Sequence, residues 1–193
     1  MLSPFAPHIA EEMWQKLGNS GMVSKSSWPA VNKAIDLEAV QSEHFLKSVM
    51  SDIANILKVT KITPKNITIY TAGQLKSSAY YLILNSVASG KTNMGEVMKE
   101  LIANPETEKI KNSPDFVQKA IKDILSIPTE IRDARMQVEK FDEKRFMSAE
   151  LEAIAKTEFG AKVSVFVEDD SDSYDPKKKA KHSRPFKPAI LIE

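Results

Sequence analysis

The densest group of ionisable side chains lies in a polar stretch near the end of the sequence, residues 168–188. Opposite charges in two successive blocks permit either a solvated hairpin tip that neutralises itself or a projecting basic segment that binds phosphates. Phosphate contacts of this kind supply affinity more than they read sequence. The acids are Glu168, Asp169, Asp170, Asp172 and Asp175, and the bases are Lys177, Lys178, Lys179, Lys181, His182, Arg184 and Lys187.

Two aromatic residues flank the basic block. Tyr174 and Phe186 could stack on an unpaired base, although Phe186, between Pro185 and Lys187, is equally consistent with a core position. A second candidate surface is the turn at 73–78, where small and polar residues would let a backbone approach closely. Gln74 and Lys76 are the side chains in this turn that could bind a ligand.

The sequence contains few residues or motifs typical of catalytic, metal-binding or nucleotide-binding sites. The sequence has no Cys, which excludes disulfides, thiolate nucleophiles and Cys-based zinc sites. Its three histidines, His8, His44 and His182, are dispersed and form no HxxxH pair. There is no GxxxxGK[ST], GxGxxG or GxSxG motif. We therefore expect no catalytic residue, no metal and no cofactor in this sequence.

The composition is that of a globular protein. The 193 residues include 27 Lys and Arg against 26 Asp and Glu, a net charge of +1, so an anionic partner must be met by a local patch. No apolar run reaches the roughly 18–20 residues that cross a bilayer. The first residues do not resemble a signal peptide. We expect a soluble, cytoplasmic protein.

The first 35 residues contain one helix that cannot bury its own apolar face. Pro4 and Pro7 precede an apolar pattern at helical spacing, and Gly18 ends it. Residues 19–35 form a loop with few core residues. This pattern predicts either a docked arm or, as we favour, a truncated helical bundle. The apolar residues of the pattern are Ile9, Met13, Trp14 and Leu17.

A long helix follows. Asp36 is a good N-cap, and an apolar stripe continues to about Lys61, a length of nearly 40 Å at ~1.5 Å per residue. Such a helix could link two domains rigidly. We accordingly divide the chain into 1–62, the end of a helical bundle with its linking helix, and 63–193, a separate domain.

The remaining residues alternate between strand and helix patterns. They predict an α+β fold, with a short, mainly antiparallel sheet covered by helices. Residues 129–140 fit either a helix or an extended connector. The predicted strands are 67–71, 163–167 and 189–192, and the predicted helices are 74–90, 94–104, 114–127 and 142–159.

Two stretches resemble a known family. Residues 2–14, LSPFAPHIAEEMW, followed by Trp28-Pro29, resemble the last part of the helical anticodon-binding domain of class I synthetases for Leu, Ile, Val and Met. In that domain the prolines set the chain entry and the Trp packs in the bundle. EFGAKV at 158–163, YDP at 174–176 and KPAILIE at 187–193 are similar to the tail of leucyl-tRNA synthetases of archaeal or eukaryotic type.

This resemblance implies that the chain binds tRNA as one region of a larger enzyme. In the family, the C-terminal domain touches the elbow and long variable arm of leucine tRNA, which helps to select the tRNA because the anticodon is largely not read. The catalytic domain, which uses ATP and Mg, and the editing domain lie upstream. Their HIGH and KMSKS signatures are not in this sequence, so we expect a fragment that is inactive alone. Its partners would be leucine tRNA and the upstream domains, with no membrane and no DNA.

The predicted tRNA contacts hold the RNA while its acceptor end moves between distant catalytic and editing sites. A rival hypothesis is a protein-interaction module that docks a partner synthetase or translation factor, whose binding would be nearly indifferent to salt. The predicted tRNA-binding residues are Lys177, Lys178, Lys179, Lys181, Arg184 and Lys187, with Gln74, Lys76, Ile192 and Glu193 as further candidates.

Overall fold

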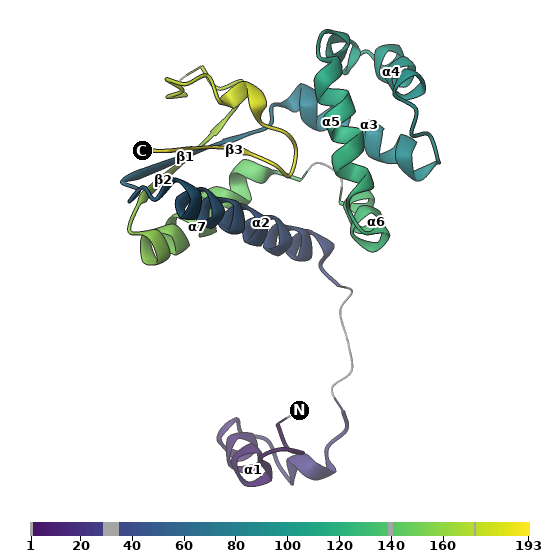
Figure 1. Cartoon of the computed structure of the whole chain (residues 1–193). Coiled ribbons are helices and arrows are strands. Elements are labelled where there is room, and N and C mark those ends of the chain that lie inside the picture. The colour runs from purple at the N-terminus through teal and green to yellow at the C-terminus, as the bar shows by residue number, and fades with distance from the viewer. Residues whose placement is uncertain (1, 29–34, 139–140, 172) are drawn as a thin grey trace. The chain divides into compact units, whose positions relative to one another are not determined.

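The structure is a computed structural model of the chain, and it describes all residues except 1, 29–34, 139–140 and 172 (Figure 1). The side chains of 148–150, 152, 153, 155 and 156 also lie outside the described part. The chain forms two compact units, Met1–Ile35 and Asp36–Glu193. Each unit is described by itself.

The first unit contains one helix and little core. Helix α1 spans Pro7–Lys16, begins with a proline as predicted, and has one buried residue, Ala10. The Glu11 carboxylate accepts hydrogen bonds from the Val23 N–H at 2.9 Å and the Ser24 N–H at 3.2 Å, at the start of the 3₁₀ turn η1, Val23–Lys25. The large apolar side chains are exposed: Leu2, Phe5, Ile9, Met13, Leu17, Met22 and Trp28.

The long helix α2, Leu37–Thr60, belongs to the second unit. The Asp36 carboxylate caps it by accepting from the Ala39 N–H at 3.0 Å, as the sequence indicated. Its stripe of Phe45, Val49 and Ile53 is buried in the core that it shares with the sheet. The boundary that we placed after residue 62 therefore falls inside a compact unit, because this stripe packs against residues that follow it in the sequence.

A three-stranded sheet forms the centre of the second unit, in the order β2-β1-β3. The strands are β1, Asn66–Thr71, β2, Lys162–Val167, and β3, Ala189–Ile192. β1 and β2 are parallel and β1 and β3 are antiparallel, so the sheet is mixed rather than mainly antiparallel. The helices between β1 and β2 supply the crossover that a parallel pair requires.

The two faces of the sheet are covered differently (Figure 1). Ile67 and Ile69 on one face pack in the main core with α2 and with α7, Glu143–Phe159. On the other face, Tyr70 and Leu191 pack against Ala180. The connection between β2 and β3 therefore lies over the second face of the sheet instead of extending into solvent.

Four further helices lie between β1 and α7 in the chain. They are α3, Gln74–Ala88, α4, Met94–Ala103, α5, Pro114–Leu125, and α6, Thr129–Gln137, with a 3₁₀ turn η2, Glu108–Asn112, between α4 and α5. Of the two alternatives for 129–140, the helix is correct over α6. None of the described helices is long and apolar enough to cross a membrane.

Candidate RNA-binding surface

The basic segment, residues 177–187, is anchored at its start by Asp175. The two carboxylate oxygens of Asp175 accept from the main-chain N–H groups of Lys179 and Ala180, both at 2.8 Å. Ala180 begins the short 3₁₀ turn η3, Ala180–His182. The hydroxyl of the buried Tyr70 donates to the main-chain oxygen of Tyr174. The segment is thus a folded loop with fixed ends.

Three lysines of this segment are free to bind an anion. Lys177, Lys178 and Lys181 are exposed, and none of them forms an ion pair with a residue that the structure describes. We call them the exposed lysine trio. Lys179 differs, because its ammonium group donates to the main-chain oxygen of Ile190 at 2.8 Å and holds the segment to β3.

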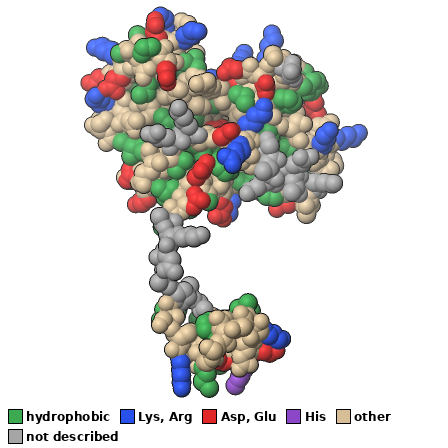
Figure 2. Space-filling view, turned by 180° about the vertical axis from the view of Figure 1, so that it is seen from behind, with side chains coloured by type: hydrophobic (Ala, Val, Ile, Leu, Met, Phe, Trp, Pro, Cys, Tyr) green, Lys and Arg blue, Asp and Glu red, His purple; other side chains and the backbone are tan. Residues whose placement is uncertain are grey.

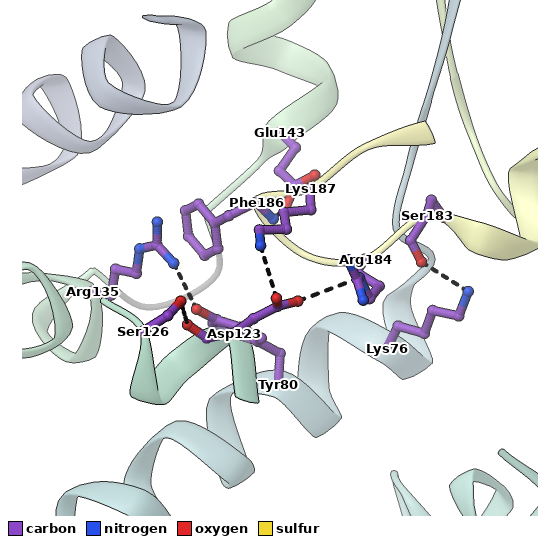
Figure 3. A network of polar contacts seen from close by, with 10 residues as sticks. All are labelled: Lys76, Tyr80, Asp123, Ser126, Arg135, Glu143, Ser183, Arg184, Phe186 and Lys187. Carbon is purple, nitrogen blue, oxygen red and sulfur yellow. Dashed lines mark hydrogen bonds and ion pairs between the residues drawn. The ribbon is translucent and has the colours of Figure 1, made fainter. Parts of the chain in front are cut away.

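Lys76, in the first turn of α3, fixes the segment from the other side. Its ammonium group donates to Glu168 Oε1 at 2.8 Å and to the Lys181 main-chain oxygen at 2.8 Å. It also donates to the main-chain oxygen of Ser183 at 2.9 Å (Figure 3). Three acceptors use all three donors of the group. Its side chain is only 14% exposed. Lys76 therefore positions the basic segment, whereas the sequence predicts it as a candidate tRNA-binding residue.

Asp123 of α5 binds two more cations of the segment (Figure 3). Its carboxylate lies 2.8 Å from Lys187 Nζ and 3.4 Å from Arg184 Nε. The side chain of Arg184 is 27% exposed and that of Lys187 is 49% exposed. Lys187 can still reach a phosphate, whereas Arg184 mainly joins the segment to α5.

The acidic block does not neutralise the exposed lysine trio. Glu168 pairs with Lys76 at 2.8 Å, and Asp170 pairs with Lys144 at 2.8 Å. Asp172 lies outside the described residues. Among the acids that the structure describes, none forms an ion pair with the trio, so the observed contacts do not favour the self-neutralising hairpin. On the face in Figure 2, Lys and Arg are interspersed with Asp and Glu.

Phe186 anchors the end of the segment. The main-chain N–H of Arg184 donates to the Lys187 oxygen at 3.0 Å and the N–H of Lys187 donates back at 2.8 Å, which closes a tight turn. Phe186 has φ 61°, a left-handed conformation that costs a non-glycine residue free energy. Its N–H donates to Glu143 Oε1 at 2.7 Å. Phe186 is 7% exposed, so it is a core residue and not a platform for a base.

Glu143 is a buried carboxyl with an altered acidity. Burial raises the pKa of Glu143 to about 8, against the opposing effects of the Phe186 N–H and the Arg135 charge. Its second oxygen, Oε2, is buried without a hydrogen-bond partner among the described residues. Glu143 is therefore largely protonated at neutral pH, which removes the cost of burying a charge.

An aromatic cluster surrounds Phe186. Its ring stacks on Phe141 with centroids 5.3 Å apart and meets Phe45 edge-on at 5.9 Å. The Arg135 guanidinium carbon lies 3.9 Å from the centre of the ring, and Arg135 Nη1 donates to the Tyr80 hydroxyl at 2.7 Å. The hydrophobic core and a cation–π contact thus fix the end of the basic segment.

The other predicted residues lie elsewhere. Gln74 is exposed at the start of α3. Ile192 packs against the core in β3, and the main-chain oxygen of Glu193 accepts from Lys65 at 2.7 Å. This places Glu193 at the start of β1, while the basic segment adjoins the other end. Because β1 has six residues, its two ends are about 17 Å apart at ~3.3 Å per residue.

Sequence reasoning missed the residues that hold the segment. Asp123, Arg135 and Glu143 act from helices far away in the chain, and no local motif marks them. Asp175-Pro176 is a turn-initiating pair that could have indicated the anchor. Among the described residues, no group of three or more His, Asp or Glu is arranged to hold a metal ion.

A family model matches the first third of the chain. Residues 1–69 match the family model described as the anticodon-binding domain of tRNA ligase, a range that includes α1, α2 and part of β1. These residues therefore resemble the anticodon-binding domain of the tRNA ligases, the aminoacyl-tRNA synthetases.

The full length of the chain is similar to one kind of ligase. It is 34% identical to the leucine–tRNA ligase of Methanosarcina acetivorans, 32% to that of Methanococcoides burtonii and 32% to that of Pyrococcus abyssi. All of the chain is aligned, with 20%, 20% and 18% of these relatives. The chain thus spans about one fifth of the length of the relatives, and these matches support the predicted C-terminal fragment of a leucine–tRNA ligase.

Proposed function

We propose that this chain is the tRNA-binding C-terminal region of a leucine–tRNA ligase and that it contacts the elbow or long variable arm of leucine tRNA. The observation that supports this most is the exposed lysine trio on an anchored loop. Three exposed cations on one short segment, with no ion pair to any described residue, can neutralise phosphates of an RNA backbone.

The mechanism is positioning. Lys177, Lys178 and Lys181 bind phosphates, and Lys187 adds a fourth contact from its half-exposed position. Because Asp175 and Lys76 already hold the loop, binding costs little ordering entropy in the protein. Ile192 and Glu193 give a second contact near the opposite end of β1. Two separated contacts would fix the orientation of the RNA as well as its position.

The whole enzyme would supply the chemistry. Aminoacylation would use ATP and Mg in a catalytic domain and editing would use a further domain, both outside this sequence. We expect the chain alone to form no leucyl-tRNA, and we expect it to act in the cytoplasm. An assay of the isolated chain with leucine, ATP, Mg and leucine tRNA tests this directly, since any leucyl-tRNA formed would contradict it.

The first unit has a separate proposed role. Its exposed apolar residues, which include Phe5, Leu17 and Trp28, need a partner surface, because one short helix cannot bury them. We propose that this unit completes the anticodon-binding helical bundle of the same ligase. The rival protein-docking hypothesis would instead use the long helix α2 and the domain that follows it to bind a partner synthetase or translation factor.

A titration tests the tRNA-binding proposal. The chain is mixed with leucine tRNA, and with the same tRNA shortened in its variable arm, at low and moderate salt. The triple variant Lys177→Ala, Lys178→Ala, Lys181→Ala should lower the slope of log K against log salt by about 2–3, because each phosphate that is no longer neutralised reduces the slope by roughly 0.7–0.9.

The control removes the same charge elsewhere, at three exposed lysines of α2, α4 and η2: Lys58→Ala, Lys99→Ala and Lys109→Ala. This variant should change the slope little. Equal reductions in the two variants would show that the charge, and not the segment, determines binding. Failure of the unmodified chain to bind at low salt would refute the proposal, and binding that ignores salt would favour protein docking.

A further inference from the structure

A cleft of about 470 Å³ lies along the face of α3 that is turned away from Lys76. Its volume is within the roughly 300–1,000 Å³ of small-molecule sites. Residues of α3, the turn after α4, α6 and the start of the α7 region line it. Its polar lining consists of Gln74, Ser77, Ser78, Asn85, Asn104 and Glu106.

Several polar groups of this lining are available to a ligand, although the side-chain oxygen of Asn104 accepts from the Glu106 N–H at 2.9 Å. Elsewhere on α3, the hydroxyls of Ser86 and Ser89 donate to main-chain oxygens one turn earlier. Ser77 and Ser78, by contrast, make no such hydrogen bond, and neither does the amide of Asn85 with any residue that the structure describes. Hydroxyl and amide groups that are available in this way, directed to one cleft, can form hydrogen bonds to the edge of a flat ligand.

The apolar part of the lining contains one ring available for stacking, that of Tyr81, together with Leu82 and Met136. Phe141 also lines the cleft, but it is only 9% exposed and its ring stacks on Phe146 with centroids 4.9 Å apart. The main-chain N–H of Phe141 donates to the Tyr81 hydroxyl at 3.3 Å, which holds the Tyr81 ring in place. Phe141 also stacks on Phe186 with centroids 5.3 Å apart. The cleft therefore shares a wall with the anchor of the basic segment.

The charge of the cleft selects against anions. Glu106 is the one charged group in the lining, and no Lys or Arg of the described residues contributes to it. A phosphate or carboxylate would meet repulsion there. A nucleobase instead combines a flat ring with donors and acceptors on its edge, and RNA is read mainly through unpaired bases of this kind.

We propose that this cleft binds one unpaired nucleobase of the RNA whose phosphates the exposed lysine trio holds, an inference that rests on the proposed function. The base lies between the aromatic and apolar walls, and its edge meets the serine and amide groups. Glu106 accepts from an exocyclic amino group, which favours adenine, cytosine or guanine over uracil. In this arrangement the lysines bind the RNA backbone and the cleft recognises one base.

Two substitutions that fill the cleft test the proposal. Ser78→Leu and Asn85→Leu place a larger apolar side chain on a helix surface, where leucine is compatible with the helix. Each should weaken binding of the full chain to leucine tRNA by about 5- to 100-fold, the range for one stacked base. The salt slope should stay unchanged, because no cation is removed. Ser51→Leu, on the exposed surface of α2, is the matched control and should leave affinity unchanged.

The outcomes separate the two proposals. If the unmodified chain binds the tRNA and both cleft variants bind equally well, the cleft proposal is wrong and the proposed function stands. If the unmodified chain does not bind, the proposed function is wrong, and the cleft is tested with nucleosides by NMR. Shifts of Ser77, Ser78 and Tyr81 amides with adenosine or cytidine, weaker with uridine, support a nucleoside site. Absence of such shifts overturns it.

Discussion

The buried carboxyl of Glu143 should make the stability of the second unit fall as pH rises. The substitution Glu143→Gln tests this, because glutamine has the shape of the protonated acid and keeps an oxygen for the Phe186 N–H, now 2.7 Å from Oε1. Glutamine cannot ionise. The variant therefore removes the pH dependence of this one group and retains the contact that holds the basic segment.

The expected change in the free energy of unfolding follows from the shift in the pKa of Glu143. The ordinary pKa of 4.5 applies to the unfolded chain, and burial raises the folded value to about 8. Between these values, the folded state binds a proton that the unfolded state has released, so the free energy of unfolding decreases with pH at about 1.4 kcal/mol per pH unit. This decrease is absent below pH 4.5 and complete above pH 8. From pH 5 to pH 9, linkage gives a loss of about 4 kcal/mol.

Urea denaturation of both proteins at pH 5, 6, 7, 8 and 9 measures the difference. The curves should meet near pH 5, and the variant should become more stable by about 4 kcal/mol at pH 9. Glu100→Gln is a control of opposite sign, because the hydrogen bond from Lys91 lowers the pKa of Glu100. That variant should lose stability relative to the unmodified chain above pH 5. Parallel curves for Glu143→Gln would refute the assignment of a neutral buried carboxyl.

Three further substitutions test how the basic segment is held. Phe186→Ala should reduce the free energy of unfolding by about 3–5 kcal/mol in urea, because it removes the aromatic centre of the anchor. Lys76→Met should cost about 2 kcal/mol and also weaken RNA binding, since it leaves three acceptors without a donor; unchanged tRNA affinity would contradict its positioning role. Asp123→Asn should increase tRNA affinity a few-fold by releasing Lys187, with under about 1 kcal/mol lost in thermal unfolding. A decrease in affinity would show that Asp123 orders the segment instead.

Much of the fold is predictable because it depends on neighbouring residues. Asp36 and Asp142 cap helices through N–H groups three residues ahead, and Gly160 ends α7 at φ 65°. Pro114 begins α5 as the first helical residue. Such signals act within one turn of helix, so a single sequence contains all of the information that they need.

Features that depend on distant residues were not predictable. The apolar stripe of α2, which includes Phe45 and Ile53, would look the same in a helical bundle or against a sheet. Strand patterns likewise do not specify whether a partner runs parallel, so the β1–β2 pairing was missed. In both cases the sequence indicates what is buried and leaves open what it is buried against.

Contacts with distant residues also determine how strongly the affinity of the chain for tRNA should depend on salt. Six cations between 177 and 187 look equivalent in the sequence, but Lys179 donates to Ile190, and Asp123 lies against Arg184 and Lys187. If all six bound phosphates, log K would fall with log salt with a slope of about 4–5. The exposed lysine trio together with Lys187 predicts a slope of about 3–4. The measured slope therefore distinguishes a loop whose cations are partly committed to its own fold from a flexible basic tail, which would release all six.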